Sequence, residues 1–384
     1  MRHLSATYQR FLASEQAGGI LLLLATVLAL CTANSSLAET YHHVWQTPLA
    51  FLSAEAWVND GLMAIFFLLI GLELKRELYV GELSSLGKAL LPTIAAIGGM
   101  IVPALIFWQF NHGTPYQAGV GIPMATDIAF ALGVLTLLGK RVPPALKVFL
   151  VAFAVIDDLG AAMMIAVFYT AALSLPHLLA ALVVLACLWA CNRLRVMSLA
   201  VYLLGGACMW WLTLQSGVHA TLAGIALAFT IPFDQHRKDV LPPAHRLQHA
   251  LHYPVAFGIL PLFAFANTGV RIDTGSLLTV LGHANSLGIM LGLLIGKPVG
   301  ITLAVWLAIR LRWCHLPAHT RWLPVIGTGL LGGIGFTMSI FITNLAFDGL
   351  PEAINVSKMA ILTGSLLSGI AGWCWLRQTL PRHR

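Results

Sequence analysis

Long apolar segments follow one another along the whole chain, separated by short polar stretches. The segments lack the period-two alternation of a membrane β-barrel, and a helix in lipid satisfies its own backbone polar groups. A bilayer core is crossed by roughly 20 residues of helix, so we predict an all-α polytopic membrane protein with about twelve transmembrane helices. The seventh and eighth are short, and the segments lie at residues 17–33, 57–72, 89–110, 119–139, 146–170, 173–191, 198–213, 217–232, 251–270, 286–309, 323–347 and 355–376.

The composition supports the same class of protein. With 58% hydrophobic and 10% charged residues over 384 positions, the chain has too few polar residues to cover a globular surface in water. The apolar runs fill the entire length, which leaves no room for a separate soluble domain. We therefore expect one integral membrane domain over residues 1–384, surrounded by lipid.

The basic residues are concentrated in every second connection between the predicted helices. The intervening connections contain only Arg271 and Lys358, so the excess of Lys and Arg predicts that both termini are cytoplasmic. The net charge of +7 then reports topology, and we expect no nucleic-acid partner. The basic connections hold 19 of the 22 Lys and Arg residues: Arg2, Arg10, Lys75, Arg76, Lys88, Lys140, Arg141, Lys147, Arg193, Arg195, Arg237, Lys238, Arg246, Arg310, Arg312, Arg321, Arg377, Arg382 and Arg384.

Two sequence features have simple alternative interpretations. The basic N-terminus followed by AGGILLLLATVLAL also fits a signal peptide, with a small-x-small site at 36–38, but cleavage would break the charge alternation, so we expect the segment to be retained. The cysteines show neither metal-ligand nor paired spacing. We expect all six to serve in packing: Cys31, Cys187, Cys191, Cys208, Cys314 and Cys374.

Four ionisable residues lie well inside the predicted segments, namely Asp127, Asp157, Asp158 and Lys297. Each costs about 2.5–3.5 kcal/mol at the centre of a membrane helix, so the group needs a function or mutual pairing. A structural salt bridge is the alternative, but one lysine neutralises only one carboxylate. Adjacent helical residues project about 100° apart, so Asp157 and Asp158 face different neighbours. A desolvated carboxylate can hold either a proton or a small hard cation, and it can exchange one for the other. We therefore predict that these residues form a transport site.

Two segments are interrupted near their middle. The fourth, GVGIPMATDIAFALGVLTLLG, has Pro123 shortly before Asp127, and the eleventh, TGLLGGIGFTMSIFITN, has a cluster of three glycines. The two are seven segments apart, an odd number, so the third to fifth and tenth to twelfth helices would run oppositely. We predict inverted repeats at about 89–170 and 286–377, with Asp127 balancing helix N-termini and Lys297 balancing helix C-termini at a midplane crossing.

Six sequence motifs closely resemble the NhaA-type sodium/proton antiporters of bacteria. They are PMATDIAFALGVL, FLVAFAVIDDLGAAM, LLIGKPVGI, GGIGFTMSIFI, WVNDGLMAIFFLLIGLELKREL and SGVHATLAG. The resemblance implies a secondary antiporter of the inner membrane that expels Na+ or Li+ for a larger number of protons. Exchange would then be electrogenic and pH-regulated, with no resident cofactor. Interrupted helices at matching positions of inverted repeats often mark an ion site. This family is itself an example of that rule, so the rule and the resemblance are not independent.

The resemblance also implies roles for individual residues. Asp158 is the expected principal ligand of the transported Na+ or Li+, and Asp157 is the second carboxylate and the expected partner of Lys297. Thr126 and Asp127 would lie at the crossing of the interrupted helices. Asp60, near the outer end of the second helix, matches a family motif and is expected to be structural.

Five residues match family positions linked to the pH response. Clustered ionisable groups at a cavity mouth shift together as pH changes, and histidine titrates in the relevant range. A solvated loop without a gating role, or a packed histidine, is the alternative. This sequence has Gln248 where the family usually has Glu, which predicts a different or less steep response. The candidates are Glu73, Glu77, His219, His249 and His252.

The stretch from Asn34 to Ala56 aligns with a segment that forms a periplasmic hairpin and mediates homodimerisation in the family. Its residues TYHHVWQTPLAFL have strand propensity, and the stretch contains no Lys or Arg, as expected for the outer face. The resemblance therefore predicts a homodimer through residues 34–56.

Other functional classes fit less well. An intramembrane aspartyl protease needs a GxGD-like setting, whereas the aspartates here stand in MATD and VIDD. A lipid-head-group transferase needs acids at the interface rather than at midspan. We therefore expect no enzyme activity. A channel or sodium symporter is the nearer alternative, but no additional polar pocket for an organic substrate is evident.

Overall fold

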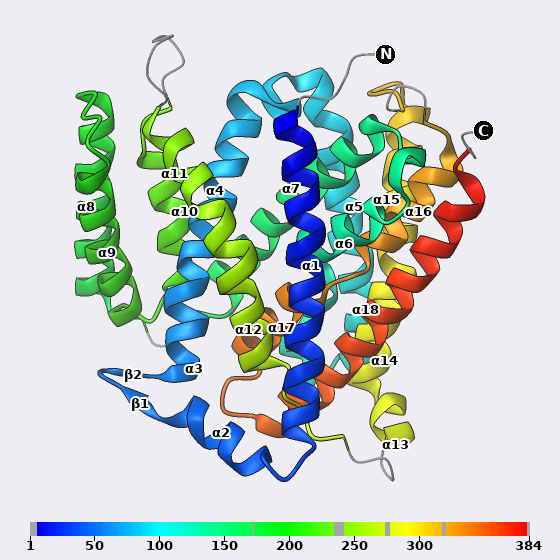
Figure 1. The fold of residues 1–384 in the computed structure, drawn as a ribbon, viewed down its shortest axis with the longest axis horizontal. Helices are drawn as coiled ribbons and strands as arrows, with labels where there is room; N and C mark the ends of the chain where they lie inside the picture. The colour runs from blue at the N-terminus through cyan, green and yellow to red at the C-terminus, as the bar shows by residue number, and fades with distance from the viewer. Residues whose placement is uncertain (1–5, 171–172, 234–241, 273–276, 317–319, 382–384) are drawn as a thin grey trace.

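The computed structural model describes residues 6–170, 173–233, 242–272, 277–316 and 320–381, and most of them are helical (Figure 1). Helices α1 to α18 are joined in places by 3-10 and π-helical turns. The α-helices are α1 (Ala6–Ala33), α2 (Ala38–Gln46), α3 (Ala54–Ala56), α4 (Met63–Val80), α5 (Leu86–Asn111), α6 (Ile128–Thr136), α7 (Pro144–Phe168), α8 (Leu175–Arg193), α9 (Leu199–Gln215), α10 (Thr221–Thr230), α11 (Pro243–Pro254), α12 (Leu260–Asn267), α13 (Leu277–Gly282), α14 (Ala284–Leu291), α15 (Lys297–Arg310), α16 (Trp322–Gly332), α17 (Phe336–Ala346) and α18 (Pro351–Thr379).

Several of these helices continue through short turns of tighter or wider geometry. The π-helical turns connect α3 to α4, α11 to α12 and α14 to α15, so these pairs form nearly continuous rods. The π-helical turns are Trp57–Leu62, Val255–Ile259 and Gly292–Gly296, and the 3-10 turns are Glu82–Ser84, Pro115–Met124 and Gly139–Arg141. Such π-turns are frequent at functional sites.

Within the described residues, seven continuous helical segments are long and apolar enough to cross a membrane, and three bent pairs raise the number to ten. Two shorter apolar helices, α9 and α10, occupy the seventh and eighth predicted positions. A helix or broken helix therefore stands at each of the twelve predicted positions, which confirms the polytopic helical class. The ten residues of α10 extend only about 15 Å, about half a bilayer core.

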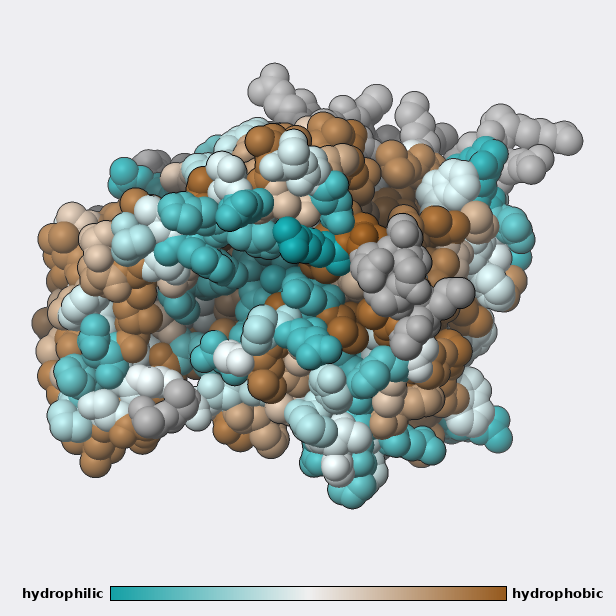
Figure 2. Space-filling view, turned by 90° about the horizontal axis from the view of Figure 1, so that it is seen from below, coloured by the Kyte–Doolittle hydropathy of each residue, from teal (hydrophilic) through white to brown (hydrophobic). Residues whose placement is uncertain are grey.

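The ends of the bundle differ in the elements they carry. The start of α1 and the end of α18 lie at one end, while α2, the two strands and α13 lie at the other (Figure 1). Seen from that second end, hydrophilic residues gather near the middle and hydrophobic residues lie toward the margins (Figure 2). Among the basic residues used for topology, Arg2, Arg237, Lys238, Arg382 and Arg384 lie outside the described residues.

The expected strand content of residues 40–52 is correct only for its last part. Strands β1 (Pro48–Leu49) and β2 (Leu52–Ser53) pair antiparallel, but the preceding residues form helix α2. Tyr41 and Trp45 lie one helical turn apart, and both rings contact Phe265 edge-on. This shared contact favours helix over strand, because tertiary packing overrides local strand propensity.

The expectation that all six cysteines serve in packing is also only partly correct. Cys314 is buried and Cys191 is partly buried, whereas the other four are exposed on the helix surfaces. An outward-facing cysteine meets no penalty in lipid, so an apolar run does not specify which face is buried.

Helix α4 and the π-turn before it are held by polar contacts to three other helices. The Lys75 amine donates to the carbonyls of Phe229 at 2.9 Å and Ile231 at 2.5 Å, at the C-terminal end of α10. Toward the other end, the Asn267 amide donates to Asn59 Oδ1 at 2.8 Å and accepts from Asn344 at 2.6 Å. These contacts join α4 to α10, α12 and α17.

Helices α5 and α15 pack closely through facing glycines. A Cβ atom at Gly98 would lie 2.3 Å from the carbonyl oxygen of Gly300, and a Cβ at Gly300 would lie 2.1 Å from that of Gly98. Because the obstacle on each side is backbone, a side chain cannot be accommodated without separating the helices. This contact sets the distance between α5 and α15.

We predict that Gly98→Ala destabilises the protein, because overpacking of a tight contact costs about 1–3 kcal/mol. Gly87→Ala on the same helix is the matched control, since no atom lies within 4 Å of its added Cβ. Thermal unfolding of the purified protein in detergent measures both. Equal midpoints for the two variants would contradict the importance of the glycine contact.

Candidate functional site

Two broken helices cross near the middle of the bundle. The turn Pro115–Met124 and α6 meet at a bend of 41°, and α16 and α17 meet at a bend of 44°. Ala125 and Asp127 have extended backbone angles, so the helix is interrupted after Pro123 as the sequence predicted. The second break falls after Gly332 in the predicted glycine cluster.

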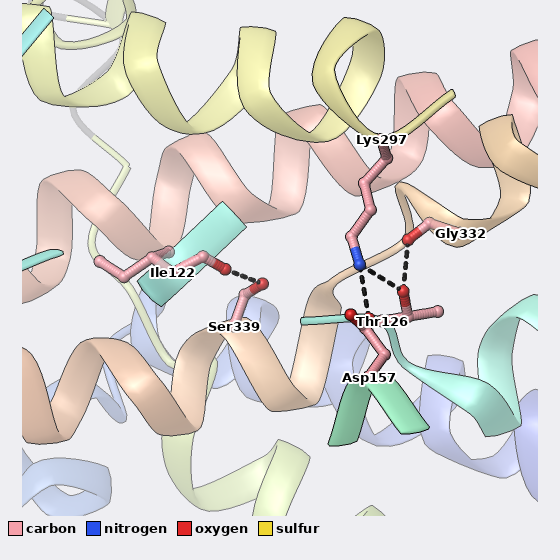
Figure 3. A network of polar contacts seen from close by, with 6 residues as sticks. All are labelled: Ile122, Thr126, Asp157, Lys297, Gly332 and Ser339. Atoms are coloured by element: carbon pink, nitrogen blue, oxygen red, sulfur yellow. Dashed lines mark hydrogen bonds and ion pairs between the residues drawn. The ribbon is translucent and has the colours of Figure 1, made fainter. Parts of the chain in front are cut away.

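Each broken helix satisfies backbone groups of the other (Figure 3). The Thr126 hydroxyl donates to the carbonyl of Gly332 at 2.8 Å, and the Ser339 hydroxyl donates to that of Ile122 at 2.6 Å. The Asp127 N–H also donates to a carbonyl of the other chain segment, that of Ile334, at 2.6 Å. Because helix ends leave backbone groups unpaired, these reciprocal bonds hold the crossing together at membrane depth.

Asp127 lies at the N-termini of two helices. Its Oδ1 accepts the N–H of Phe130 in the first turn of α6 at 2.9 Å. Its Oδ2 accepts from Thr337 twice, from the N–H at 3.2 Å and from the hydroxyl at 2.5 Å. The side chain is buried, and a carboxylate at a helix N-terminus is favoured by the partial positive charge there. This placement matches the one expected for Asp127.

Lys297 and Asp157 form a fully buried ion pair (Figure 3). The Lys297 amine lies 2.5 Å from Asp157 Oδ2 and donates to the Thr126 hydroxyl at 2.9 Å. Because Thr126 in turn donates to Gly332, the lysine reaches the C-terminal end of α16 through one hydroxyl. The contact with helix C-termini is thus indirect.

Asp158 follows Asp157 on α7 but has a different environment. It lines a cavity of about 90 Å³ together with Asp127, Glu73 and His252. Its Oδ1 is buried and has no hydrogen-bond partner among the residues that the structure describes. A single water needs about 10–15 Å³ of such volume, so the cavity has room for a small cation with several waters. The two adjacent carboxylates therefore face different neighbours, as their helical spacing predicts.

The remaining candidates are divided between the cavity and other places. Glu73 and His252 line the cavity, whereas Glu77 and His249 do not belong to its wall. Glu77 lies 3.0 Å from the Arg76 guanidinium, and His249 is exposed.

His219 and Asp60 lie away from the cavity. The ring of His219 is within 2.7 Å of the carbonyl of Tyr169, just after the end of α7. The backbone carbonyl of Asp60 accepts from Trp210 at 2.9 Å. Both contacts join neighbouring elements.

Two side chains at the crossing were not predicted as site residues. Thr337 bonds to Asp127 twice, and Ser365 of α18 accepts the N–H of Phe336 at 3.1 Å. A hydroxyl two residues after the glycine cluster is a local signal that points to Thr337. Ser365 has no comparable signal, because it is brought to the crossing by a separate helix.

Comparisons with known proteins agree with this geometry. Residues 9–376 match the model of the family described as "Na+/H+ antiporter 1". The chain is 58% identical over 377 residues to the Na(+)/H(+) antiporter NhaA of Dechloromonas aromatica, covering 97% of this chain and 96% of the relative. It is 52% identical to NhaA 1 of Flavobacterium johnsoniae and 51% identical to NhaA of Salmonella arizonae, in each case over 99% of both chains. The chain therefore belongs to the NhaA family of Na+/H+ antiporters, which are transporters rather than enzymes.

Proposed function

We propose that this antiporter expels Na+ or Li+ at the Asp157–Asp158 pair in exchange for a larger number of protons. The observation that carries the proposal is the contrast between the two carboxylates. Asp157 is neutralised by Lys297, whereas Asp158 lines the cavity and forms no ion pair with the described residues. Each of the two carboxylates has one buried oxygen without a hydrogen-bond partner in the described part of the chain. An ionised Asp158 in this place requires a positive charge, which either a proton or a small cation supplies.

Competition for one carboxylate couples the movement of the cation to the movement of protons. Na+ and Li+ are hard cations that prefer oxygen ligands, and Asp158, with Asp157 beside it, offers carboxylate oxygens. A cation entering the site displaces protons, and protons returning from the other side displace the cation. Asp127, Thr126 and Lys297 support the site by neutralising helix ends and holding Asp157 in place.

Two helical repeats of opposite orientation, at about 89–170 and 286–377, would let the site open to either side. Two features support this proposal. Each repeat would contain one broken helix, and the two bends are similar, 41° and 44°. The facing glycines of α5 and α15 also join the first helix of each repeat.

The proposed location is the bacterial inner membrane, with both termini in the cytoplasm. The charge alternation and the position of α1 and α18 at one end of the bundle support this orientation. If two protons enter for each Na+ that leaves, the potential contributes about 2.3 kcal/mol per 100 mV to the cycle. Exchange in proteoliposomes should then respond to a potassium–valinomycin potential.

The proposed assembly is a homodimer through residues 34–56. Strands β1 and β2 lie beside α2 at the edge of the molecule (Figure 1), and Phe51 between them packs edge-on against Trp211 of α9. A two-stranded hairpin is marginally stable by itself, so pairing with a second copy would add to its stability. Cross-linking of a single cysteine at the hairpin tip between two copies tests this assembly.

For pH regulation, the proposed set narrows to the groups at the cavity, Glu73 and His252. Glu77, His249 and His219 would act only indirectly, because they do not line that cavity. Gln248 is buried on α11 one turn before His252, so the two side chains share a helix face. The amide at this position carries no charge to influence the histidine.

We predict that Asp158→Asn abolishes Na+- and Li+-induced release of a pH gradient in everted vesicles. The amide cannot exchange a proton for a cation, so the signal from a pH-sensitive dye should fall to background. Glu352→Gln removes an exposed acid of α18 and should leave exchange unchanged. Gradient release that survives Asp158→Asn would overturn the site assignment, and dependence on an organic solute would indicate symport.

Lys297→Met should lower thermal stability strongly, because an unpaired buried carboxylate costs about 3–5 kcal/mol. Asp157→Asn combined with Lys297→Met should recover part of that loss, since no charge is then left alone. Thermal unfolding of the single and double variants in detergent measures the coupling. Purely additive losses would show that the pair does not stabilise the protein.

Gln248→Glu should shift the pH at which exchange is half-maximal, because it places a carboxylate one helical turn from His252. Gln117→Glu, at an exposed position in the turn Pro115–Met124, is the charge-matched control. Exchange measured over a pH series in proteoliposomes compares them. Identical pH profiles for the wild type and Gln248→Glu would contradict an influence of residue 248 on the pH response.

A further inference from the structure

Two serines on α18 face the crossing of the broken helices. Ser365 and Ser368 are three residues apart, so they lie on the same face of the helix. Both are buried, with 6% and 0% of their surface exposed. Neither belongs to the lining of the cavity that contains Asp158.

Ser365 positions the first turn of α17. Its hydroxyl oxygen accepts the N–H of Phe336 at 3.1 Å, and the next N–H along the chain, that of Thr337, donates to Asp127. Two adjacent amides at the start of α17 are therefore held by two different elements. Loss of the bond between Ser365 and the Phe336 N–H would therefore move the adjacent N–H of Thr337, from which Asp127 accepts a hydrogen bond.

Ser368 contacts the turn that leads to Lys297. The N–H of Lys297 bonds to the carbonyl of Gly292, five residues back, as in a π-helix. Continuing that pattern would pair residue 298 with the carbonyl of Leu293, but Pro298 has no N–H. The Ser368 hydroxyl donates to this Leu293 carbonyl at 3.4 Å. The serine thus compensates for a bond that the proline removes.

The break between α16 and α17 touches the same two groups. A Cβ atom at Gly333 would lie 2.2 Å from the Leu293 carbonyl oxygen and 2.5 Å from the Ser368 hydroxyl. Three elements therefore meet without space between them: the turn before Lys297, the break before α17, and α18. Only glycine at 333 allows this approach.

From these contacts we propose that Ser365 and Ser368 are positioning residues for the transport site. They hold α17 in a fixed position relative to the turn before Lys297. Helix α17 carries Thr337, which bonds to Asp127, and the turn leads to Lys297, which pairs with Asp157. The two halves of the site are then kept at a constant spacing, which sets how tightly the cation is bound. The inference rests on the proposed transport site at Asp157 and Asp158.

The test measures Na+/H+ exchange in proteoliposomes for Ser365→Ala, Ser368→Ala and the wild type. We expect the apparent KM for Na+ to rise about tenfold in Ser365→Ala, the factor that corresponds to an unpaired buried donor. The maximal rate should change less than about twofold, because the carboxylates that carry the cation remain. Ser368→Ala should raise KM in the same direction. The ratio of KM values for Na+ and Li+ should also change.

Thr363→Val is the matched control. The Thr363 hydroxyl lies on the same helix but donates to its own backbone, at the carbonyl of Met359, 2.9 Å away. Removing it should leave KM unchanged. Ser365→Thr keeps the hydroxyl and should bring KM back toward the wild-type value.

The outcomes separate the inference from the proposed function. Unchanged KM values in both alanine variants would overturn the positioning role. A lower yield of folded protein, with a wild-type KM in the folded fraction, would also overturn it. If Ser365→Ala yields no folded protein, Ser365→Cys replaces it, and a raised KM supports the role while a normal KM overturns it. Absence of exchange in the wild type would instead overturn the proposed function.

Discussion

The central constraint on this molecule is the cost of charge in a low-dielectric interior. Lys297 and the aspartates at the crossing are almost fully buried, so each needs a partner within the protein or a mobile ion. The partners are distributed unevenly: Lys297 serves Asp157, helix N-termini serve Asp127, and Asp158 faces a cavity. Asp158 is thus the carboxylate without an ion-pair partner among the described residues, and there we propose that a cation and protons compete.

Broken helices supply what continuous helices cannot. A continuous membrane helix pairs its backbone groups internally and offers nothing to a neighbour at midplane. Here each break frees carbonyl and N–H groups, which the other broken helix and α18 then satisfy. The site is consequently built from backbone as well as side chains, and its geometry depends on contacts such as Gly98 with Gly300 and Gly333 with Leu293.

The features that could be predicted from the sequence are those that depend on residues close together in the chain. Pro123 and the glycines after Leu331 disrupt helices by themselves, so both breaks were predictable from composition. The spacing of Asp157 and Asp158 predicted different environments, but the pairing of Asp157 with Lys297 followed only from family resemblance. Contacts between distant segments, such as Ser365 with Phe336 or Glu73 with His252 around one cavity, have no local signal. The helix at residues 38–46 was missed for the same reason, because its aromatic contacts with Phe265 are tertiary.

The anchoring of α4 limits how this protein can change shape. Its C-terminal half is tied through Lys75 to the carbonyls that finish α10, and the π-turn before its N-terminus is tied through Asn59 to Asn267. Sliding or turning α4 would break these bonds together. Helices α4, α10 and α12 are therefore tied to one another by polar contacts at two levels of the bundle, and we expect them to move as one unit.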